Sequence, residues 1–538
     1  MRWWGWGEES HPPALPPHAL DRLRHELGLA PGARGERVSL DAVRLPDRAL
    51  GDGARAALER ATGAGWVRDD RESRIRHAAG RGLPDLLRLR RGEADPAPDA
   101  VVSPGGDAEL RAVLEACAEH RVAVVPFGGG TSVVGGVEPL RGGCEAVIAL
   151  DLARLDTVDV DARSLLAGAG AGVRLPELEA RLGRAGVTLG HFPQSFEYAT
   201  VGGCVATRSA GQASTGYGRI DELVRGVRLA APAGDLAPPA LPASAAGPDL
   251  RELVVGSEGA LGVISEATLT VRPAPAVRRY EGVVFASFAE GAEALRACAQ
   301  RDAAPDVARL SDEDETRLTL TLAGESRATR AMGLYLRARG IRGGCLAIVG
   351  WEGAGHHVRR RRARSLAVLR HAGAVPLGAA PGRAWARARF EGPYLRDDLL
   401  DHGVLVETLE TAHRWSRVDD LYRNVAGALR AALRARATPP LVLCHISHLY
   451  ETGASLYFTF LARAQPGAEL EQWRAAKEAA SEAIVAAGAT ITHHHAIGRD
   501  HVRWLGAEAG ELGLEALRAA KERLDPAGIM NPGKLLLG

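Results

Sequence analysis

Apolar positions recur along the chain with two periods, and each period predicts a different kind of element. Between residues 96 and 276, short apolar runs separated by turn residues predict strands, with stretches of helical spacing between them. The predicted strands are 100–102, 122–125, 146–150, 157–160 and 164–169; the predicted helices are 107–120, with Asp107 as N-cap, and 175–182. Because strands outnumber helices, we expect this part of the chain to be α+β.

The pattern changes after residue 277, where apolar runs alternate with long amphipathic stretches up to residue 485. The predicted strands are 282–285, 346–350, 403–407, 441–446 and 455–460; the predicted helices are 290–301, 357–372, 417–435 and 470–487. Such alternation indicates a second domain, of α/β type, with its own sheet.

The flanking segments lack a domain pattern of their own. Residues 1–95 read as an N-terminal segment, in which Trp3, Trp4 and Trp6 are expected to be aromatic anchors on the body of the protein, with a partner surface as the alternative. Residues 486–538 form a C-terminal segment with an apparent strand at 490–495 and a helix near 512–524. We therefore divide the chain into 1–95, 96–276, 277–485 and 486–538.

A glycine-rich loop follows the predicted strand 122–125. Its residues are Pro126, Phe127, Gly128, Gly129, Gly130, Thr131 and Ser132. Adjacent glycines allow successive backbone N–H groups to point at one anion, and the two hydroxyls add further donors. No lysine follows as in a P-loop, and the spacing is not G-x-G-x-x-G. The loop predicts a dinucleotide site, with a plain turn as the alternative.

Composition limits the functions that remain. The chain has 538 residues and a net charge of +1, so no overall field recruits nucleic acid, and the arginine run 359–362 fits a solvated helix face. The six cysteines lie far apart, and no apolar stretch approaches the roughly 18 residues of a spanning helix. We expect a soluble, cytoplasmic protein.

Candidate chemistry gathers near the C-terminus. His493, His494 and His495 end the apparent strand, where alternate side chains face opposite ways, so we predict no metal site. Imidazoles can instead donate hydrogen bonds and exchange protons near neutral pH, with ordinary packing as the alternative. Tyr457 alternates with apolar neighbours and can face a pocket, but its ordinary pKa of about 10 demands nearby cations if it acts as a base. Cys444, with His445 and His448 close by in sequence, favours structural packing.

Five motifs appear in the order found in one flavoprotein family. They are 126–132, His191-Phe192-Pro193-Gln194-Ser195, Ala199-Thr200-Val201-Gly202-Gly203, Thr207-Arg208-Ser209-Ala210-Gly211 and Gly256-Ser257-Glu258-Gly259-Ala260-Leu261-Gly262-Val263-Ile264. The chain resembles FAD-binding proteins of the vanillyl-alcohol oxidase and p-cresol methylhydroxylase (PCMH) type. The resemblance implies a two-subdomain FAD-binding domain at 96–276, a cap domain for substrate at 277–485, and a C-terminal segment that returns to the FAD-binding domain and completes the active site.

The same resemblance implies which residues hold the cofactor FAD. The pyrophosphate would lie on residues 126–132. Further flavin contacts would come from Gln194, Ser195, Phe196, Glu197, Tyr198, Ala199, Thr200, Thr207, Arg208, Ser209, Ala210, Glu258, Gly259, Ala260, Leu261, Gly262, Val263 and Ile264.

Within that superfamily the chain looks like the alkyldihydroxyacetonephosphate synthase family. The likeness rests on Trp4-Gly5-Trp6-Gly7, Tyr394-Leu395-Arg396-Asp397, Glu407-Thr408-Leu409-Glu410-Thr411, Leu456-Tyr457-Phe458, the three histidines and Asp525-Pro526 followed by Ile529. It implies exchange of the acyl chain of acyl-dihydroxyacetone phosphate for a fatty alcohol, with no net redox change and a covalent adduct at flavin N5. Tyr457 would move the substrate proton, His493, His494 and His495 would relay protons, and Arg396 and Arg309 would bind substrate.

Departures from the family keep other readings open. Phe192 and Gln194 stand where the family commonly has acidic residues. The alternatives are an FAD-linked oxidase or dehydrogenase of a 2-hydroxy acid such as D-lactate or glycolate, and a binding protein that kept the fold. The expected partners are lipid-like small molecules, with a homodimer as the expected assembly and peripheral membrane contact left open.

Overall fold

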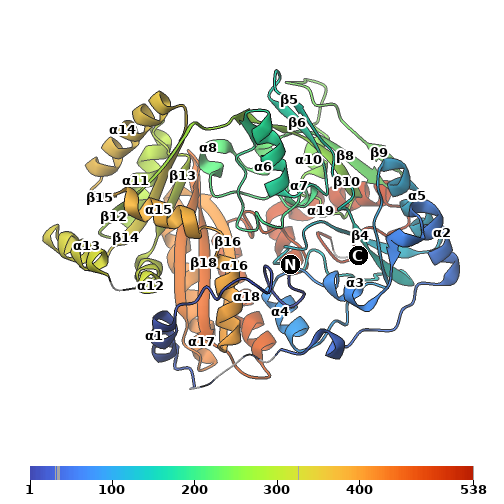
Figure 1. Cartoon of the computed structure of the whole chain (residues 1–538), viewed down its shortest axis with the longest axis horizontal. Coiled ribbons are helices and arrows are strands. Elements are labelled where there is room, and N and C mark those ends of the chain that lie inside the picture. The colour runs from blue at the N-terminus through green and yellow to red at the C-terminus, as the bar shows by residue number, and fades with distance from the viewer. Residues whose placement is uncertain (31, 33–34, 36, 325, 537–538) are drawn as a thin grey trace.

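The computed structural model describes residues 1–30, 32, 35, 37–324 and 326–536. Three larger sheets organise this part of the chain. Two of them lie on the right of Figure 1 and are built from residues before 271, and a seven-stranded sheet from residues 277 to 463 lies on the left. The predicted α+β class is confirmed.

The first sheet is small and mixed. Its strand order is β1 (Val67–Arg68), β2 (Ala100–Val102), β4 (Ala146–Asp151) and β3 (Val122–Phe127), with β2, β4 and β3 parallel. Helices α2 (Asp52–Thr62), α3 (Arg71–Arg76) and α5 (Asp107–Glu119) accompany it. The N-cap of α5 is Gly106 rather than the predicted Asp107, which instead opens the first turn. Strand β3 ends at the glycine-rich loop.

The second sheet is antiparallel. Its order is β5 (Val158–Asp161), β6 (Leu166–Gly170), β10 (Val263–Thr270), β8 (Val224–Ala231) and β9 (Gly234–Leu236). Its helices are α6 (Leu175–Arg184), α7 (Val201–Ala206), α8 (Ser214–Tyr217), α9 (Ile220–Leu223) and α10 (Arg251–Val254), and β7 (Val187–Thr188) pairs with β11 (Arg272–Pro273). The loops at 194–200 and 256–262 therefore adjoin α7 and β10.

The third sheet forms the cap and is antiparallel throughout. Its order is β15 (Val375–Gly378), β12 (Val277–Phe285), β14 (Cys345–Gly353), β13 (Val307–Ser311), β17 (Leu441–Leu449), β18 (Gly453–Arg463) and β16 (Val404–Arg414). Its helices are α11 (Phe288–Gln300), α12 (Glu313–Ala323), α13 (Arg327–Ala338), α14 (Gly355–His371), α15 (Ala379–Ala388), α16 (Gly392–Asp401), α17 (Trp415–Ala435) and α18 (Glu469–Ala486). Strand β13 has no counterpart in the predicted set, because Arg309 interrupts a short apolar run.

The N-terminal segment spans both halves. Trp6 is buried against Tyr198 and Tyr394, while α1 (Pro17–Leu27) buries its leucines in the core of the cap. Trp3 is also buried, and α4 (Leu83–Arg90) packs against α18. The predicted role of the tryptophans as anchors agrees with this packing.

The C-terminal segment lies against the first sheet. Helix α19 (Leu505–Leu524) is kinked at Gly510, and Met530 forms a parallel bridge with Val124 of β3. Residues 490–495 are not a strand, so that prediction is wrong. The backbone amides of His493, His494 and His495 are bound by a buried carboxylate instead of a neighbouring strand, as described below.

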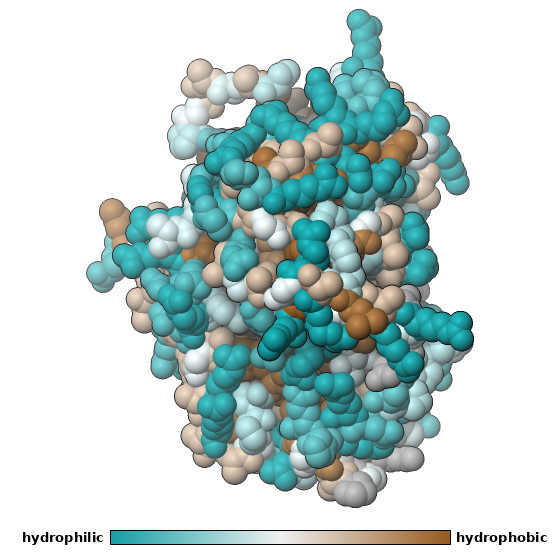
Figure 2. All heavy atoms as spheres, turned by 90° about the vertical axis from the view of Figure 1, so that its left-hand side faces the viewer, coloured by the Kyte–Doolittle hydropathy of each residue, from teal (hydrophilic) through white to brown (hydrophobic). Residues whose placement is uncertain are grey.

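The outer face of the cap is mainly hydrophilic, with apolar side chains scattered singly over it (Figure 2). None of the helices in the described ranges is both long enough and apolar enough to span a bilayer.

Candidate active site

One row of side chains crosses four strands of the cap sheet. Ser311 of β13 is paired with His445 of β17, His445 with Tyr457 of β18, and Tyr457 with Glu410 of β16. Residues directly opposite one another share a face of the sheet. The ladder registers therefore place an imidazole, a phenol and a carboxylate side by side.

Glu410 fixes the backbone of the three histidines. Its side chain is fully buried and accepts a hydrogen bond from Thr492 Oγ1 at 2.6 Å. It also accepts from the backbone amides of His493 at 2.5 Å, His494 at 3.0 Å and His495 at 2.8 Å. One carboxylate thus takes the place of the strand partner that the sequence pattern suggested.

The charge of Glu410 is stabilised by this environment. Burial by itself would raise the pKa of the carboxyl, but it is outweighed by the Thr492 hydroxyl and by His494, His495 and His493, whose protonated forms attract the anion at the acidic pH where Glu410 would titrate. The pKa of Glu410 is therefore held well below its usual value, and the group is an anion at neutral pH.

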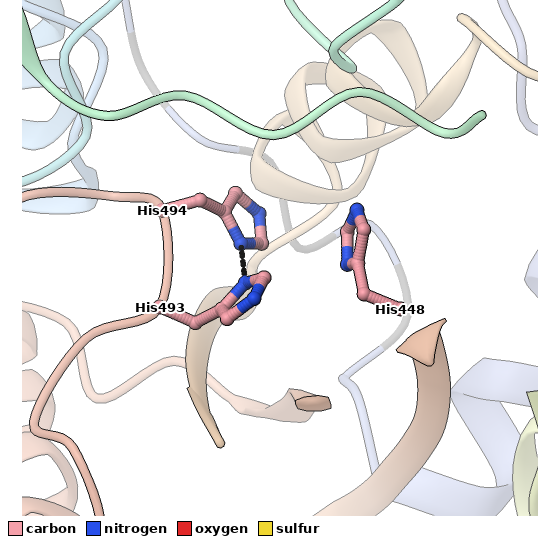
Figure 3. Close-up of side chains that lie close together, drawn as sticks. All are labelled: His448, His493 and His494. Carbon is pink, nitrogen blue, oxygen red and sulfur yellow. Dashed lines mark hydrogen bonds between the residues drawn. The ribbon is translucent and has the colours of Figure 1, made fainter. Parts of the chain in front are cut away.

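A second group of histidine contacts lies beyond Glu410. The Nδ1 atoms of His493 and His494 face each other at 2.9 Å, and His448 lies opposite them (Figure 3). His448 Nε2 donates to the carbonyl of Gly211 at 3.0 Å, and His493 Nε2 is 2.5 Å from the Tyr450 hydroxyl. The cap thereby touches Gly211, the last residue of one of the motifs that carried the resemblance.

These histidines are neutral at physiological pH. Burial lowers the pKa of His448 to about 3 and that of His494 to about 4, and it lowers those of His493 and His495 as well. Ring nitrogens of His448, His493 and His494 lie within 4.8 Å of one another, a grouping that the strand argument against a metal did not foresee. Each of these three rings already has a hydrogen-bonded partner, so the absence of a metal stays our prediction.

Tyr457 lies among the imidazoles, as its predicted role requires. Its ring centroid is 5.9 Å from that of His494, 5.5 Å from that of His495 and 4.9 Å from that of His445. Burial nevertheless raises the pKa of Tyr457 to about 12, and the carboxylates of Glu410 and Glu407 act in the same direction. The phenol is therefore protonated at neutral pH, and a positively charged group must lower its pKa before it can act as a base.

Arg309 approaches the same row from β13. Its guanidinium donates to His445 Nε2 at 3.0 Å and to Glu315 at 2.5 Å, while His445 Nδ1 lies 3.1 Å from Glu315. Burial would raise the pKa of Glu315, but His445 and Arg309 lower it to about 2. Arg309 therefore contacts His445, the ring that stacks on Tyr457, and its positive charge is balanced by the negative charge of Glu315.

Arg396 is on α16, near the glycine-rich loop. Its Nη1 donates to the carbonyl of Arg81 at 2.7 Å, and the amide of Arg81 donates to the carbonyl of Ser132 at 2.6 Å. Nε and Nη2 of Arg396 are buried and have no hydrogen-bond partner within the described ranges. Buried guanidinium donors without a partner are suited to binding an anion.

The glycine-rich loop has the geometry of an anion cradle. Within the described part of the chain, the amides of residues 128–131 donate no hydrogen bond. A Cβ on Gly128 would lie 2.3 Å from Thr200 Oγ1, and one on Gly129 would lie 2.0 Å from the carbonyl of Tyr198. Gly130 has φ +64, which favours glycine. Free amides and close loop packing fit a diphosphate.

The remaining segments expected at the cofactor converge on this loop. A Cβ on Gly259 would be 2.9 Å from Pro126. Glu258 is buried and accepts from the amides of Ile497 at 2.8 Å and Gly498 at 2.7 Å, and burial raises its pKa to about 7. The chain after the three histidines is therefore joined to the loop at 258–264.

Some expected flavin residues direct their side chains elsewhere. Glu197 accepts from Trp6 Nε1 at 3.2 Å and from the Tyr394 hydroxyl at 3.1 Å. Tyr198 packs edge-on against Trp6, and Arg208 donates to the carbonyl of Val255 at 3.0 Å. Any contact of these residues with the cofactor would be made by their backbone.

Comparisons with known proteins agree with this arrangement. Residues 98–237 match the family described as FAD binding domain, and residues 274–535 match the family described as FAD linked oxidases, C-terminal domain. An alkyldihydroxyacetonephosphate synthase of Dictyostelium discoideum is 34% identical over 479 residues, 87% of this chain and 78% of that protein. The chain belongs to the alkyldihydroxyacetonephosphate synthase family. As a member of this family it is an FAD-dependent enzyme.

Solved structures support the same assignment. A structure of an alkyldihydroxyacetonephosphate synthase aligns with TM-score 0.85 at 29% identity, covering 99% of this chain and 98% of that one. A p-cresol methylhydroxylase structure aligns with TM-score 0.67 at 14% identity, over 90% of this chain and 96% of that one, and shows the shared fold. The free amides at 128–131 and the buried donors of Arg396 fit the diphosphate and other anionic groups that such an enzyme must hold.

Several residues of the site were not among the predicted ones. Glu410 stands inside a motif that carried the resemblance, but nothing in the sequence distinguishes it from neighbouring acids. His445 and His448 read as packing residues: three positions apart on a regular strand they would face opposite sides, and the irregular pairing between Ile446 and Leu449 cannot be read from the sequence. Tyr450 and Arg81 carry no sequence signal that we recognise.

Proposed function

We propose that this member of the alkyldihydroxyacetonephosphate synthase family replaces the acyl chain of acyl-dihydroxyacetone phosphate with a fatty alcohol. The observation that carries the proposal is the row of Tyr457 and Glu410, with the three histidines bound to Glu410. A phenol in contact with neutral imidazoles is suited to proton transfer, because these groups can pass a proton among themselves while Glu410 stays an anion.

The exchange is balanced without an external oxidant or reductant. The bond between the substrate carbon and the carboxylate oxygen breaks, a bond from the same carbon to the alcohol oxygen forms, and the alcohol proton leaves with the fatty acid. FAD, when bound, would be held by the free amides of residues 128–131 and would supply an electrophilic N5 for this chemistry.

Tyr457 is the proposed proton carrier. It would take the proton from the substrate carbon next to the carbonyl and return it after the alcohol has added. The pKa of Tyr457 is about 12 in the structure, so the phenol would need additional positive charge beside it in the complex with FAD and substrate before it could act as a base. His494 and His495, whose rings lie near the phenol, would pass the proton onwards.

Arg396 and Arg309 are the proposed substrate-binding cations. Arg396 has buried donors available for a carboxylate or carbonyl oxygen. Arg309 is bonded to Glu315 and His445. Because Glu315 already balances its charge, its main part in substrate binding would be to orient His445 and the phenol.

The alternative reaction is oxidation of a 2-hydroxy acid such as D-lactate or glycolate. The two are separated by incubating the FAD-loaded protein with acyl-dihydroxyacetone phosphate and a fatty alcohol, and in parallel with the hydroxy acids. Our proposal expects repeated turnover, with continued release of fatty acid, only when the alcohol is present; without the alcohol, release should stop at one fatty acid per bound flavin. Bleaching of the flavin by a hydroxy acid, without such release, would favour the alternative.

Three further proposals concern the surroundings of the enzyme. We propose a homodimer, testable by light scattering, and a cytoplasmic location, testable by cell fractionation. We also propose reversible contact with lipid surfaces, to which Leu320, Leu334 and Tyr335 on α12 and α13 are suited because they are exposed. Co-sedimentation with vesicles before and after Leu334→Glu tests that contact.

A further inference from the structure

A cavity of about 300 Å³ lies apart from the Tyr457 row, where four parts of the chain meet. Its walls come from α4, from the loop after the glycine-rich loop at 135–138, from α18 and from residues 499–504. Helices α4 and α18 are neighbours below the centre of Figure 1. The volume is at the lower end of the range found for small-molecule sites.

Most charges in this cavity are paired with one another. The ion pairs are Arg88 with Asp85 at 2.9 Å and with Glu138 at 2.7 Å, Arg499 with Glu138 at 2.6 Å, and Arg503 with Glu478 at 2.9 Å. These pairs contain three arginines and three acids, so their charges balance among themselves.

Two cations in the cavity have no such partner. Lys477 is 4% exposed, and its ammonium makes neither a hydrogen bond nor an ion pair with any residue in the described ranges. Arg474, one turn earlier on α18 at the cavity mouth, is exposed and is also without a partner in those ranges. The Lys477 ammonium is therefore free to pair with an anion that enters the cavity.

The other walls add a hydrogen-bond donor and an apolar surface. Burial raises the pKa of the Asp500 carboxyl to about 7, so a share of it is protonated and able to donate. Leu470, Trp473 and Trp504 line the same space. The Trp473 indole nitrogen is already bound to Glu407 at 2.8 Å, which fixes the ring as part of the wall.

We propose that this cavity binds an amphiphilic anion, with the headgroup at Lys477 and Arg474 and the apolar chain along Trp473, Trp504 and Leu470. The headgroup chemistry fits either a fatty carboxylate or a lipid phosphate monoester. The inference does not depend on the proposed reaction, because the site is defined by charge and apolar surface away from Tyr457.

The test is to measure direct binding to the FAD-loaded protein, with calorimetry and tryptophan fluorescence as the two readouts. The probes are dodecanoate, a lysophosphatidate with a chain of the same length, and inorganic phosphate. We expect one or both amphiphiles to bind and to change the fluorescence, and the stronger of the two identifies the headgroup. Failure of both to bind, or phosphate binding as tightly as either, would overturn the proposal.

Variants locate the binding. Lys477→Met and Arg474→Ala should each weaken the amphiphile by roughly tenfold or more, the effect of losing a charged hydrogen-bond partner. Arg434→Met, at an exposed position on α17, is the matched control and should bind like the wild type. Flavin content and circular dichroism check folding, and Arg474→Ala serves if Lys477→Met does not fold.

Two outcomes would contradict the location. Wild-type affinity in both Lys477→Met and Arg474→Ala would remove the headgroup site. Loss of binding in His494→Ala with full binding in Lys477→Met would place the amphiphile in the Tyr457 row instead.

Discussion

Tyr457 and Glu410 are direct cross-strand neighbours on β18 and β16, and Glu410 also binds the amides of three successive histidines. The phenol and the histidine loop are thereby fixed to one sheet position, although they are separated in sequence by more than the length of α18. Proton transfer depends on such fixed geometry, since a small misplacement lowers the rate steeply.

Tyr457→Phe should lower turnover by about 10²–10⁴-fold, the range typical of a lost acid–base group. The bound FAD should be retained, because no part of the glycine-rich loop contacts this side chain. Turnover and flavin absorbance of the purified variant measure both. Tyr335→Phe, exposed on α13, is the control; near wild-type turnover in Tyr457→Phe would exclude the residue from the chemistry.

Glu410→Gln should loosen the loop that carries the histidines. An amide offers one acceptor oxygen where the carboxylate serves three backbone amides and one hydroxyl, so we expect a loss of roughly 1.5–3 kcal/mol in the free energy of unfolding and a reduced kcat. Denaturant unfolding measures the first. Glu482→Gln on the exposed side of α18 should leave both unchanged.

The same residue gives stability a pH dependence. The folded pKa of Glu410 is depressed, so its contribution is fully present above the unfolded value of about 4.3 and is lost as pH falls through the folded pKa. The acid limb of the unfolding curve of the wild type should therefore be steeper than that of Glu410→Gln. Identical limbs would show that Glu410 carries no stabilising charge.

Gly129→Ala should lower the FAD content of the purified protein. The added Cβ would lie 2.0 Å from the carbonyl of Tyr198, so the loop must move away from the segment it packs against. The ratio of flavin to protein absorbance measures the loss. Gly143→Ala is matched to it, since its nearest atom would be 4.0 Å away, and it should bind FAD normally.

Acid should destabilise the fold through buried histidines. Burial lowers the pKa values of His191, His448 and His501 to about 3, below the value of about 6.5 in the unfolded chain. Between these limits the unfolded chain takes up protons that the folded chain does not, so the free energy of unfolding falls as pH drops from about 6.5 to about 3. His501→Gln should flatten this slope, whereas the exposed His371→Gln should not.

Arg396→Lys should raise KM more than it lowers kcat, while Arg396→Ala should affect both. A lysine keeps the charge but not the planar pair of donors that Nε and Nη2 present. Steady-state kinetics of the two variants separate the contributions. Arg387→Lys, exposed on α15, should behave like the wild type; if Arg396→Ala did too, Arg396 would have no part in substrate binding.

The sequence predicted most strands and helices because their periodicity is local. Strand β13 escaped because Arg309, a residue of the site, breaks its apolar run. Residues 490–495 were mistaken for a strand because three β-branched residues stand together at 490–492, and only the fold brings Glu410 close enough to accept from the amides of the histidines. A contact between residues about eighty positions apart cannot be read from the local helix or strand periodicity of the sequence.

The candidate site divides in the same way. Loop 126–132 and Tyr457 could be recognised from glycine spacing and strand alternation. Glu410, Tyr450 and Arg81 could not, because their roles arise from strand register and from packing between distant segments.

The proposed exchange is tested most directly by following labelled fatty alcohol and the flavin spectrum together, in FAD-loaded protein supplied with acyl-dihydroxyacetone phosphate. The account predicts label in an ether product, with the flavin oxidised at the end and no label in Tyr457→Phe. Absence of labelled product in the wild type, together with bleaching of its flavin by D-lactate or glycolate, would contradict it.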